Sequence, residues 1–171
     1  MTASVNDSCY IGAELMKIEY LADRPEFLRT LAEWQHGEWG HLRPNDTVEA
    51  RMTRLGGWGE RDRIPLTVVA HDDGKLLGSA SLIAHDMHTR MELTPWLAGV
   101  FVAPEYRRRG VGAVLVRHIV TEAGRLNVPV LYLYTVHSET FYASLGWSLQ
   151  EHTSYRDQNV AIMTCRPTAS P

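Results

Sequence analysis

Residues 96–126 have the sequence WLAGVFVAPEYRRRGVGAVLVRHIVTEAGRL. The apolar run at 96–102 predicts a strand, and the spacing of apolar residues from Val111 to Leu126 predicts a helix. Between them lies a turn with three consecutive arginines, followed by Gly110 and Gly112. Unpaired N–H groups at the start of a helix, together with the positive end of the helix dipole, form a site for phosphate. The sequence therefore predicts a strand, a phosphate-binding turn and a helix.

The residue types of this turn suit a diphosphate. Its glycines permit unusual backbone dihedrals and let a ligand approach the amides, and its arginines add positive charge. A Rossmann fingerprint would need a third glycine where Leu115 stands, and a P-loop would need a Gly-Lys-Ser/Thr sequence that the chain lacks. Taken alone, the glycines fit a basic surface turn before an amphipathic helix equally well.

Two motifs together resemble a known family. The turn has the form Arg-x-x-Gly-x-Gly, and about thirty residues later the chain reads FYASLGW at 141–147. Over residues 17–166 the chain resembles the GNAT superfamily of acetyl-CoA-dependent N-acetyltransferases, and more loosely it is similar to the actin N-terminal acetyltransferases within it. The pair of motifs is far more specific than either motif alone.

The resemblance implies a fold of the α/β (α+β) class. This is a mixed, mostly antiparallel, seven-stranded sheet with two central splayed parallel strands, here 96–102 and 130–134, and about four helices. It also implies acetyl-CoA as cosubstrate, with the pantetheine arm between the splayed strands and the diphosphate on the turn. The implied cofactor contacts, mostly through the backbone, are Val100, Phe101, Val102, Arg107, Arg108, Arg109, Gly110, Val111, Gly112 and Ala113.

By resemblance, acetyl passes directly to a primary amine in a ternary complex, and Tyr142 is the general acid for the CoA thiolate. A phenol with a pKa of about 10 stays protonated at neutral pH, and a thiolate whose acid has a pKa of about 8.5 can accept or share its proton. The alternative is that the Tyr142 ring packs in the core and its hydroxyl bonds to the backbone.

The general base departs from the family pattern. Many relatives carry a glutamate inside the central strand, but residues 96–99 read WLAG. Glu92, in the preceding loop, is the candidate base. The other options are water and the side chains of Asp86, His85, His88 and His137. Although His85, Asp86, His88 and Glu92 are close in sequence, their spacing places ligands on adjacent loop residues, so no metal site is expected.

Two helices are expected on the acceptor side. A capping box at 23–26 should start the first helix, which reaches about residue 36, and residues 45–47 should cap the second, which ends at 56–57. By resemblance, the substrate contacts are Trp34, Trp39 and Arg54, with tryptophan packing as the alternative. Arg51 lies one turn from Arg54. If both enter the cleft, they favour an acidic peptide or a carboxylated amine; otherwise they form a solvated face.

The remaining pattern predicts strands and turns. A first strand is expected at 16–22, and the DDG turn at 72–74 joins strands at 66–70 and 75–84. The small residues at 78–80 indicate a bulge or a close backbone approach. Ser138 should cap a short helix that ends at Gly146. A final hairpin pairs 147–154 with 160–166 through a turn at 156–159.

The composition describes an ordinary globular domain. The chain has 171 residues, 44% hydrophobic, with a net charge of −3 and no apolar run near the length of a membrane span. We expect an extension at 1–15, one domain at 16–167 and a loose tail at 168–171, with Met1 and Met16 both open as natural start. Cys9 and Cys165 match no metal or redox spacing, which favours free thiols and a cytoplasmic location.

The partners follow from charge and resemblance. A net negative charge disfavours nucleic acid, and no membrane partner is expected. Dimers are frequent among the relatives, so a homodimer is one option. The acceptor is a peptide N-terminus or a small amine, since an α-amine with a pKa of about 8 is more often neutral than a lysine. The alternatives are a non-catalytic acyl-CoA-binding regulatory domain and an antibiotic or small-metabolite acetyltransferase.

Overall fold

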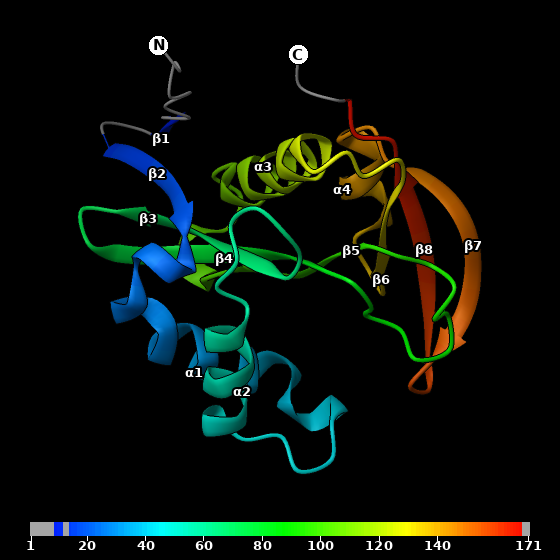
Figure 1. Ribbon diagram of the computed structural model, residues 1–171, viewed down its shortest axis with the longest axis horizontal. Coiled ribbons are helices and arrows are strands. Elements are labelled where there is room, and N and C mark those ends of the chain that lie inside the picture. The colour runs from blue at the N-terminus through cyan, green and yellow to red at the C-terminus, as the bar shows by residue number, and fades with distance from the viewer. Residues whose placement is uncertain (1–8, 12–13, 169–171) are drawn as a thin grey trace.

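The protein, analysed as a computed structural model that describes residues 9–11 and 14–168, is built on one mixed sheet (Figure 1). The strand order is β1-β2-β3-β4-β5-β6-β8-β7. The strands are β1 (Cys9–Ile11), β2 (Glu14–Tyr20), β3 (Leu66–Asp72), β4 (Lys75–Ile83), β5 (Trp96–Val102), β6 (Leu131–Thr135), β7 (Ser148–Tyr155) and β8 (Gln158–Cys165). The seven predicted strands are confirmed, and the short β1 pairs with β2 as an eighth. Residues 1–8 and 12–13 of the predicted extension, and 169–171 of the predicted tail, lie outside the described residues.

The central pair of strands diverges, as the family resemblance implies. All neighbouring strands run antiparallel except β5 and β6, which are parallel. Their register consists of one pair, Trp96 with Tyr132, and the Tyr132 N–H donates to the Pro95 carbonyl at 3.0 Å. Beyond this point the β5 edge that faces β6 has no partner strand among the described residues. Apart from the Val102 carbonyl, which accepts a hydrogen bond from Arg107 Nε, the backbone groups of that edge are therefore available to a ligand.

Helices cover both faces of the sheet (Figure 1). α3 (Val111–Arg125) and α4 (Glu139–Ser144) pack on one face, where Val68 joins the core around Leu115. α1 (Leu28–Trp39) and α2 (Val48–Gly57) pack on the other, where Val69 contacts the cluster around Leu31. Adjacent residues of β3 face opposite layers because side chains alternate along a strand.

The start of α1 differs from the prediction. The chain first makes the 3₁₀ turns η1 (Leu21–Asp23) and η2 (Pro25–Phe27), and α1 begins at Leu28 without a side-chain cap. The predicted capping box is wrong because the Asp23 carboxylate pairs with Arg61 instead of the helix amides. α1 also runs to Trp39, past the predicted end, and leads into η3 (Gly40–Leu42).

The caps of the other helices are mixed. α2 starts as predicted, because the Thr47 hydroxyl accepts a hydrogen bond from the Ala50 N–H at 3.0 Å. Ser138 occupies the N-cap position of α4 but caps nothing with its side chain. Its own N–H donates to the Thr135 hydroxyl at 3.0 Å, which orients the approach to the helix from β6.

The two hairpins follow their turn residues. Asp73 and Gly74 have φ of 40° and 78°, which confirms the predicted β3–β4 turn. The β7–β8 turn has two residues, Arg156 and Asp157, both with positive φ, whereas the sequence pattern predicts a four-residue turn. Positive φ at both central positions matches the twist of a two-residue hairpin, so pairing continues closer to the turn.

Candidate functional site

A cavity of about 610 Å³ opens where β5 and β6 diverge. Its walls come from residues 97–100 of β5, residues 133–135 of β6 and Tyr142 of α4. α1, η3 and α2 close it on the other face of the sheet, and the loop after β4 and the β7–β8 turn close its far end. A volume of this size is typical of small-molecule sites.

A bulge shapes the β5 wall of the cavity. The register passes from Ser81 opposite Ala98 to Ser79 opposite Phe101, so Gly99 and Val100 together face one residue of β4. Gly99 has φ +59°, which a residue with a Cβ rarely adopts. A Cβ on Gly78 would meet the Phe101 carbonyl oxygen, which confirms the close backbone approach expected as one alternative at residues 78–80. The extra residue of the bulge belongs to β5, opposite Ala80.

Tyr142 is buried and borders the cavity. The residue is 8% exposed, and its ring packs against Phe141 and Trp147 at centroid distances of 5.1 and 6.2 Å. Its hydroxyl makes no hydrogen bond to another described residue. The structure therefore contradicts the alternative in which this hydroxyl bonds to the backbone. Burial raises the pKa of Tyr142 to about 12, so its proton is retained at every physiological pH.

The loop after β4 brings Asp86 and His85 to the cavity, and residue 137 enters beside α4. Glu92 is exposed and lies outside the lining, as does His88, whose Nδ1 is 3.0 Å from the Tyr155 hydroxyl. Burial raises the pKa of Asp86 to about 6, against the opposing effect of the charges on Arg43 and Arg156. Asp86 thus titrates close to neutral pH, which suits a proton acceptor.

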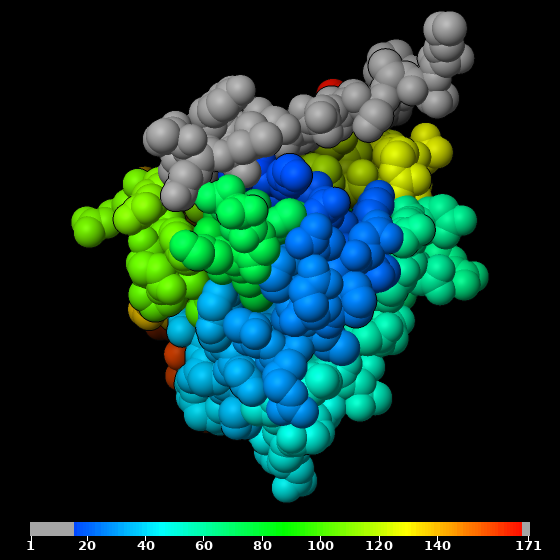
Figure 2. Space-filling view, turned by 90° about the vertical axis from the view of Figure 1, so that its left-hand side faces the viewer, coloured from blue at the N-terminus to red at the C-terminus, as the bar shows by residue number. Residues whose placement is uncertain are grey.

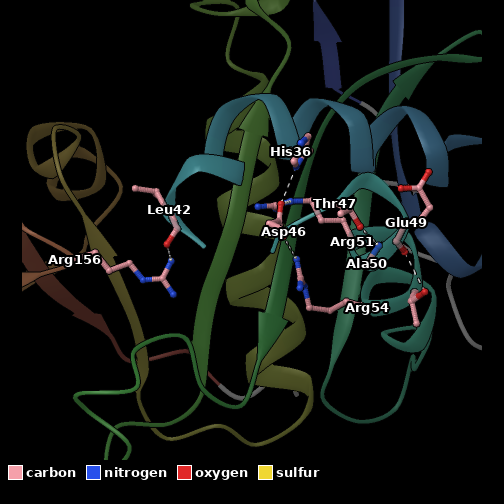
Figure 3. Close-up of polar contacts among 10 residues, drawn as sticks. His36, Leu42, Asp46, Thr47, Glu49, Ala50, Arg51, Arg54 and Arg156 are labelled. Carbon is pink, nitrogen blue, oxygen red and sulfur yellow. Dashed lines mark hydrogen bonds and ion pairs between the residues drawn. The ribbon is translucent and has the colours of Figure 1, made fainter. Parts of the chain in front are cut away.

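Asp46 joins α1 to α2 beside the cavity (Figure 3). Its Oδ2 lies 2.9 Å from His36 Nδ1 and accepts a hydrogen bond from Arg51 Nε at 2.6 Å. Its Oδ1 lies 3.5 Å from Arg54 Nη2. Burial would raise the pKa of Asp46, but the hydrogen bonds from His36 and Arg51 and the charges of both arginines outweigh it and lower this pKa. The carboxylate is therefore ionised and fixes both arginine side chains.

Replacing Asp46 with asparagine should lower the free energy of unfolding by about 3 to 5 kcal/mol, because Arg51 then stays buried without a counter-charge. Urea denaturation measures the loss.

The stabilisation by Asp46 also depends on pH. Because the pKa of Asp46 is lower in the folded protein, this stabilisation is present above the unfolded pKa of about 4 and disappears as the pH falls through the lower folded pKa. Glu33→Gln, which removes the exposed pair with Arg29, is the control and should change stability by less than about 0.5 kcal/mol. Equal losses in the two variants would contradict the role of Asp46.

The predicted phosphate turn lies at one side of the molecule, where yellow-green atoms project at the left edge of the space-filling view (Figure 2). Arg108 and Gly110 have φ of 59° and 84°. The N–H groups of Val111, Gly112 and Ala113 have no backbone acceptor among the described residues, because the first bond of α3 runs from Val114 to the Gly110 carbonyl. These three N–H groups lie where the sequence predicts a phosphate site and have no intrahelical acceptor.

The arginines of the turn are held in different ways. Arg107 Nε donates to the Val102 carbonyl at 2.9 Å, and its guanidinium lies 5.7 Å from the centre of the Phe101 ring. Arg109 lies 5.9 Å from the centre of the Tyr106 ring. Arg108 is exposed and forms no ion pair with another described residue. The turn is thus tied to the end of β5 and still presents positive charge.

The two tryptophans expected as substrate contacts separate in space. Trp39 lines the cavity and makes an edge contact with the buried Phe101 at 6.1 Å. Trp34 packs on Phe101 at 5.6 Å and joins the core under α1 without reaching the lining. Phe101 is thus the floor on which both rings pack, and the structure brings Trp39 and Arg54, but not Trp34, to the cavity.

Sequence reasoning missed several residues of the lining. Arg43 enters from the segment after η3, and Arg156 enters from the β7–β8 turn, where its Nη1 donates to the Leu42 carbonyl at 3.1 Å (Figure 3). Asp46 was expected only as part of a helix cap. Neither residue 43 nor residue 156 carries a motif that could have located it, since both depend on how distant loops pack together.

The described part of the chain offers neither a cluster of metal ligands nor a membrane span. No group of three or more His, Cys, Asp or Glu side chains there could hold a metal ion. None of its helices is long and apolar enough to cross a membrane.

The sequence matches a family model described as acetyltransferase (GNAT) domain over residues 64–149, just over half of the chain. The chain belongs to the GNAT acetyltransferase family. The matched region runs from β3 to β7 and so contains the diverging strands, the phosphate turn and Tyr142. No match was found among the curated proteins.

Solved structures share the GNAT fold of this chain. An aminoglycoside 6'-N-acetyltransferase complexed with coenzyme A is 16% identical with a TM-score of 0.70, covering 90% of this chain and 98% of that one. The spermidine/spermine N-acetyltransferase SpeG from Vibrio cholerae is 16% identical with a TM-score of 0.66, covering 92% and 95%. The ribosomal-protein-S18-alanine N-acetyltransferase from Escherichia coli is 22% identical with a TM-score of 0.60, covering 91% and 96%. At these identities the likeness is one of fold.

Proposed function

We propose that this GNAT protein transfers acetyl from acetyl-CoA to a primary amine, directly and within a ternary complex, with Tyr142 as the general acid. One observation carries the proposal. The Tyr142 hydroxyl borders the cavity between the diverging strands and has no hydrogen-bond partner in the described chain. The hydroxyl is thus accessible from the cavity and free to donate a hydrogen bond to a group bound there, as a catalytic donor must be.

The residues on the cofactor side fit acetyl-CoA. The unpaired edge of β5 can bond the amides of a pantetheine arm as a neighbouring strand would. The free N–H groups at the start of α3 can hold a diphosphate, with Arg108 and Arg109 near by. Both contacts use the backbone, so side-chain identity at Val100 and Val102 matters little.

Acetyl-CoA supplies the activated acetyl group, and the residues of the chain handle the protons. Because the pKa of Tyr142 is about 12, above the value of about 8.5 for a thiol, Tyr142 stabilises the leaving sulfur as a hydrogen-bond donor more than by complete proton transfer. The donated bond strengthens as negative charge develops on the sulfur, so it acts in the transition state.

We assign the general base to Asp86 in place of Glu92. Asp86 lines the cavity and has a pKa of about 6, whereas Glu92 faces solvent. Taking a proton from an ammonium group of pKa about 8 costs Asp86 about 2 pKa units, and from a lysine of pKa about 10.4 more than 4 units. α-Amines and other amines of low pKa are therefore the favoured acceptors.

A screen of acceptors that follows the release of the CoA thiol tests the function. Turnover with at least one class of primary amine is expected, and kcat/KM for a peptide α-amine should exceed that for Nα-acetyl-lysine by about 200-fold at pH 7, the ratio of their neutral fractions. Equal values for the two amines would remove the preference. Binding of CoA without turnover of any amine would instead indicate a CoA-binding domain that lacks catalysis.

Replacing Gly110 with valine should raise the Kd for CoA by about 10-fold or more, measured by calorimetry. Gly110 has φ +84° at the N-cap of α3, where a β-branched residue is strained and disturbs the free amides. Gly74→Val is the matched control, because Gly74 has φ +78° and, like Gly110, open space where a Cβ would lie, but it belongs to the β3–β4 turn. It should lose similar stability and keep the Kd for CoA. Weakened CoA binding in both variants would mean that strain alone explains the effect.

A further inference from the structure

The lining of the acceptor cavity has more positive than negative side chains. Among the described residues it contains four arginines and two carboxylates, namely Arg43, Arg51, Arg54 and Arg156, and Glu38 and Asp86. The whole protein, by contrast, has a net charge of −3. The excess of positive charge is therefore a local property of the site.

Arg51 is the most deeply placed of these arginines. Its side chain is 5% exposed, and only its Nε has an acceptor, Asp46 Oδ2 at 2.6 Å. Nη2 is buried without a partner, and no described residue accepts from Nη1. A guanidinium has five N–H donors, and leaving most of them unsatisfied in a buried position is unfavourable. Arg51 also lines the cavity, so an anion bound there meets a guanidinium whose donors are mostly unsatisfied.

Arg54 competes with Arg51 for the same counter-charge. Its Nη2 lies 3.5 Å from Asp46 Oδ1, and 29% of its side chain is exposed. Burial, together with the positive charges of Arg43 and Arg51, lowers the pKa of Arg54, whereas Asp46 raises it. A single carboxylate therefore faces Arg51, Arg54 and His36 (Figure 3), which leaves this side of the cavity short of negative charge.

We propose that the acceptor is a primary amine that also carries a carboxylate, with the carboxylate bound by Arg51 and Arg54 and the amine directed to Asp86. This inference rests on the proposed acetyltransferase function and names its substrate class. Arg43 lies within electrostatic range of both ends of the cavity, because its positive charge lowers the pKa of Arg54 at one end and of Asp86 at the other. A planar carboxylate matches the fork of N–H groups that a guanidinium presents.

The same charges oppose a polycationic acceptor. Two structural neighbours are by their names aminoglycoside and spermidine/spermine acetyltransferases, and those compounds carry several amines. Such an acceptor would place cationic groups beside Arg51 and Arg54, where like charges repel each other. The arginine cluster therefore disfavours, in this protein, the polycationic acceptors that the names of those neighbours state.

The test compares two acceptors that differ in one charge. Glutamic acid α-amide and glutamine α-amide have similar sizes and similar α-amines, but only the first has a side-chain carboxylate. We expect kcat/KM to be about 10- to 100-fold higher for glutamic acid α-amide, chiefly through KM, as for one charge-assisted pair. The pair Glu-Ala-Ala-amide and Gln-Ala-Ala-amide repeats the comparison in peptides and shows whether the natural source of the carboxylate is a free amine or a peptide N-terminus.

Variants then assign the preference to the cluster. In Arg54→Gln the ratio of the two kcat/KM values should fall to within about threefold, and Arg54→Lys, which keeps the charge, should restore most of it. Arg29→Gln is the matched control, since Arg29 is exposed on α1, pairs with Glu33 and lies outside the cavity, and it should keep the full ratio. Melting temperatures of all variants check that they fold.

The outcomes separate the two proposals. Equal kcat/KM for the acidic and neutral amides, or a higher value for spermidine or an aminoglycoside, overturns the substrate class while leaving the acetyltransferase function in place. If no amine releases the CoA thiol, the proposed function fails. Calorimetric titration of both amides into CoA-saturated protein still decides the charge preference in that case: tighter binding of the acid supports it, and equal binding overturns it.

Discussion

Tyr142→Phe is expected to lower kcat by about 10²- to 10⁴-fold while changing the KM for acetyl-CoA by less than about threefold. General acid catalysis typically contributes this range, and the hydroxyl bonds to no other described residue, so its removal strands no partner. The ring remains packed between Phe141 and Trp147, which keeps the cavity wall in place. Steady-state kinetics and CoA binding, measured on the same preparation, give the two quantities.

Tyr132→Phe is the matched control for this experiment. Tyr132 is on β6, packs its ring on Trp96 at 5.8 Å and does not line the cavity. Its loss of one hydroxyl should leave kcat within about twofold of the wild-type value. The assignment of Tyr142 fails if both variants lose activity equally, or if Tyr142→Phe acts through the KM for acetyl-CoA with kcat unchanged.

Asp86→Asn is the substitution with the second large expected effect on activity. It should lower kcat/KM for the acceptor by about 10²- to 10³-fold at pH 7.5, because asparagine cannot accept the proton of the ammonium group. In the wild type, the raised pKa of Asp86 places the acid limb of the kcat/KM profile near pH 6: activity is low below it, where Asp86 is protonated, and rises as the carboxylate ionises. Profiles from pH 5 to 9, taken with one acceptor, should show this limb in the wild type and lack it in Asp86→Asn.

The charges around Asp86 determine in which direction the acid limb of the pH profile should move when one of them is removed. Arg43 and Arg156 lower the pKa of Asp86, although burial outweighs them. Arg156→Gln removes one of these charges, so the pKa of Asp86 should rise and the acid limb should move to higher pH. A limb that stays in place, or moves to lower pH, would show that another group controls it.

Glu92→Gln compares the two carboxylates of the same loop. Glu92 is exposed and outside the cavity, so its neutral variant should keep kcat/KM within about twofold and keep the acid limb. A loss as large as that of Asp86→Asn would return the role of base to Glu92. If neither variant loses activity, a cavity histidine or a water molecule is the acceptor, and His85→Gln and His137→Gln are the next variants to measure.

Much of the fold could be predicted because local signals agree with each other. The apolar strand, the arginine-glycine turn and the periodic helix appear as β5, the phosphate turn and α3, and the Asp73-Gly74 dipeptide makes the expected hairpin. The splaying of β5 from β6 came from the family resemblance and not from local pattern. Local chemistry misled where a side chain had a distant partner, as with Asp23, which pairs with Arg61 rather than capping α1.

The acceptor side was harder to predict because it depends on the packing of loops. Arg90 ties the loop after β4 to β7 through Glu151 at 2.8 Å, and within this loop Asp86 borders the cavity while Glu92 faces solvent. Sequence spacing alone gave no reason to prefer one carboxylate over the other. Likewise, the convergence of His36, Arg51 and Arg54 on Asp46 requires the angle between α1 and α2, which no pattern in the sequence encodes.

The division between main-chain and side-chain contacts has a consequence for redesign. The splayed edge of β5 and the start of α3 offer backbone groups, whereas the opposite half of the cavity offers side chains from three separate loops and helices. A library randomised at positions 43, 54 and 156 should therefore change which amines are accepted without weakening the binding of the coenzyme. Position 51 is best left unrandomised, because most replacements of Arg51 would leave the buried Asp46 carboxylate without its closest counter-charge.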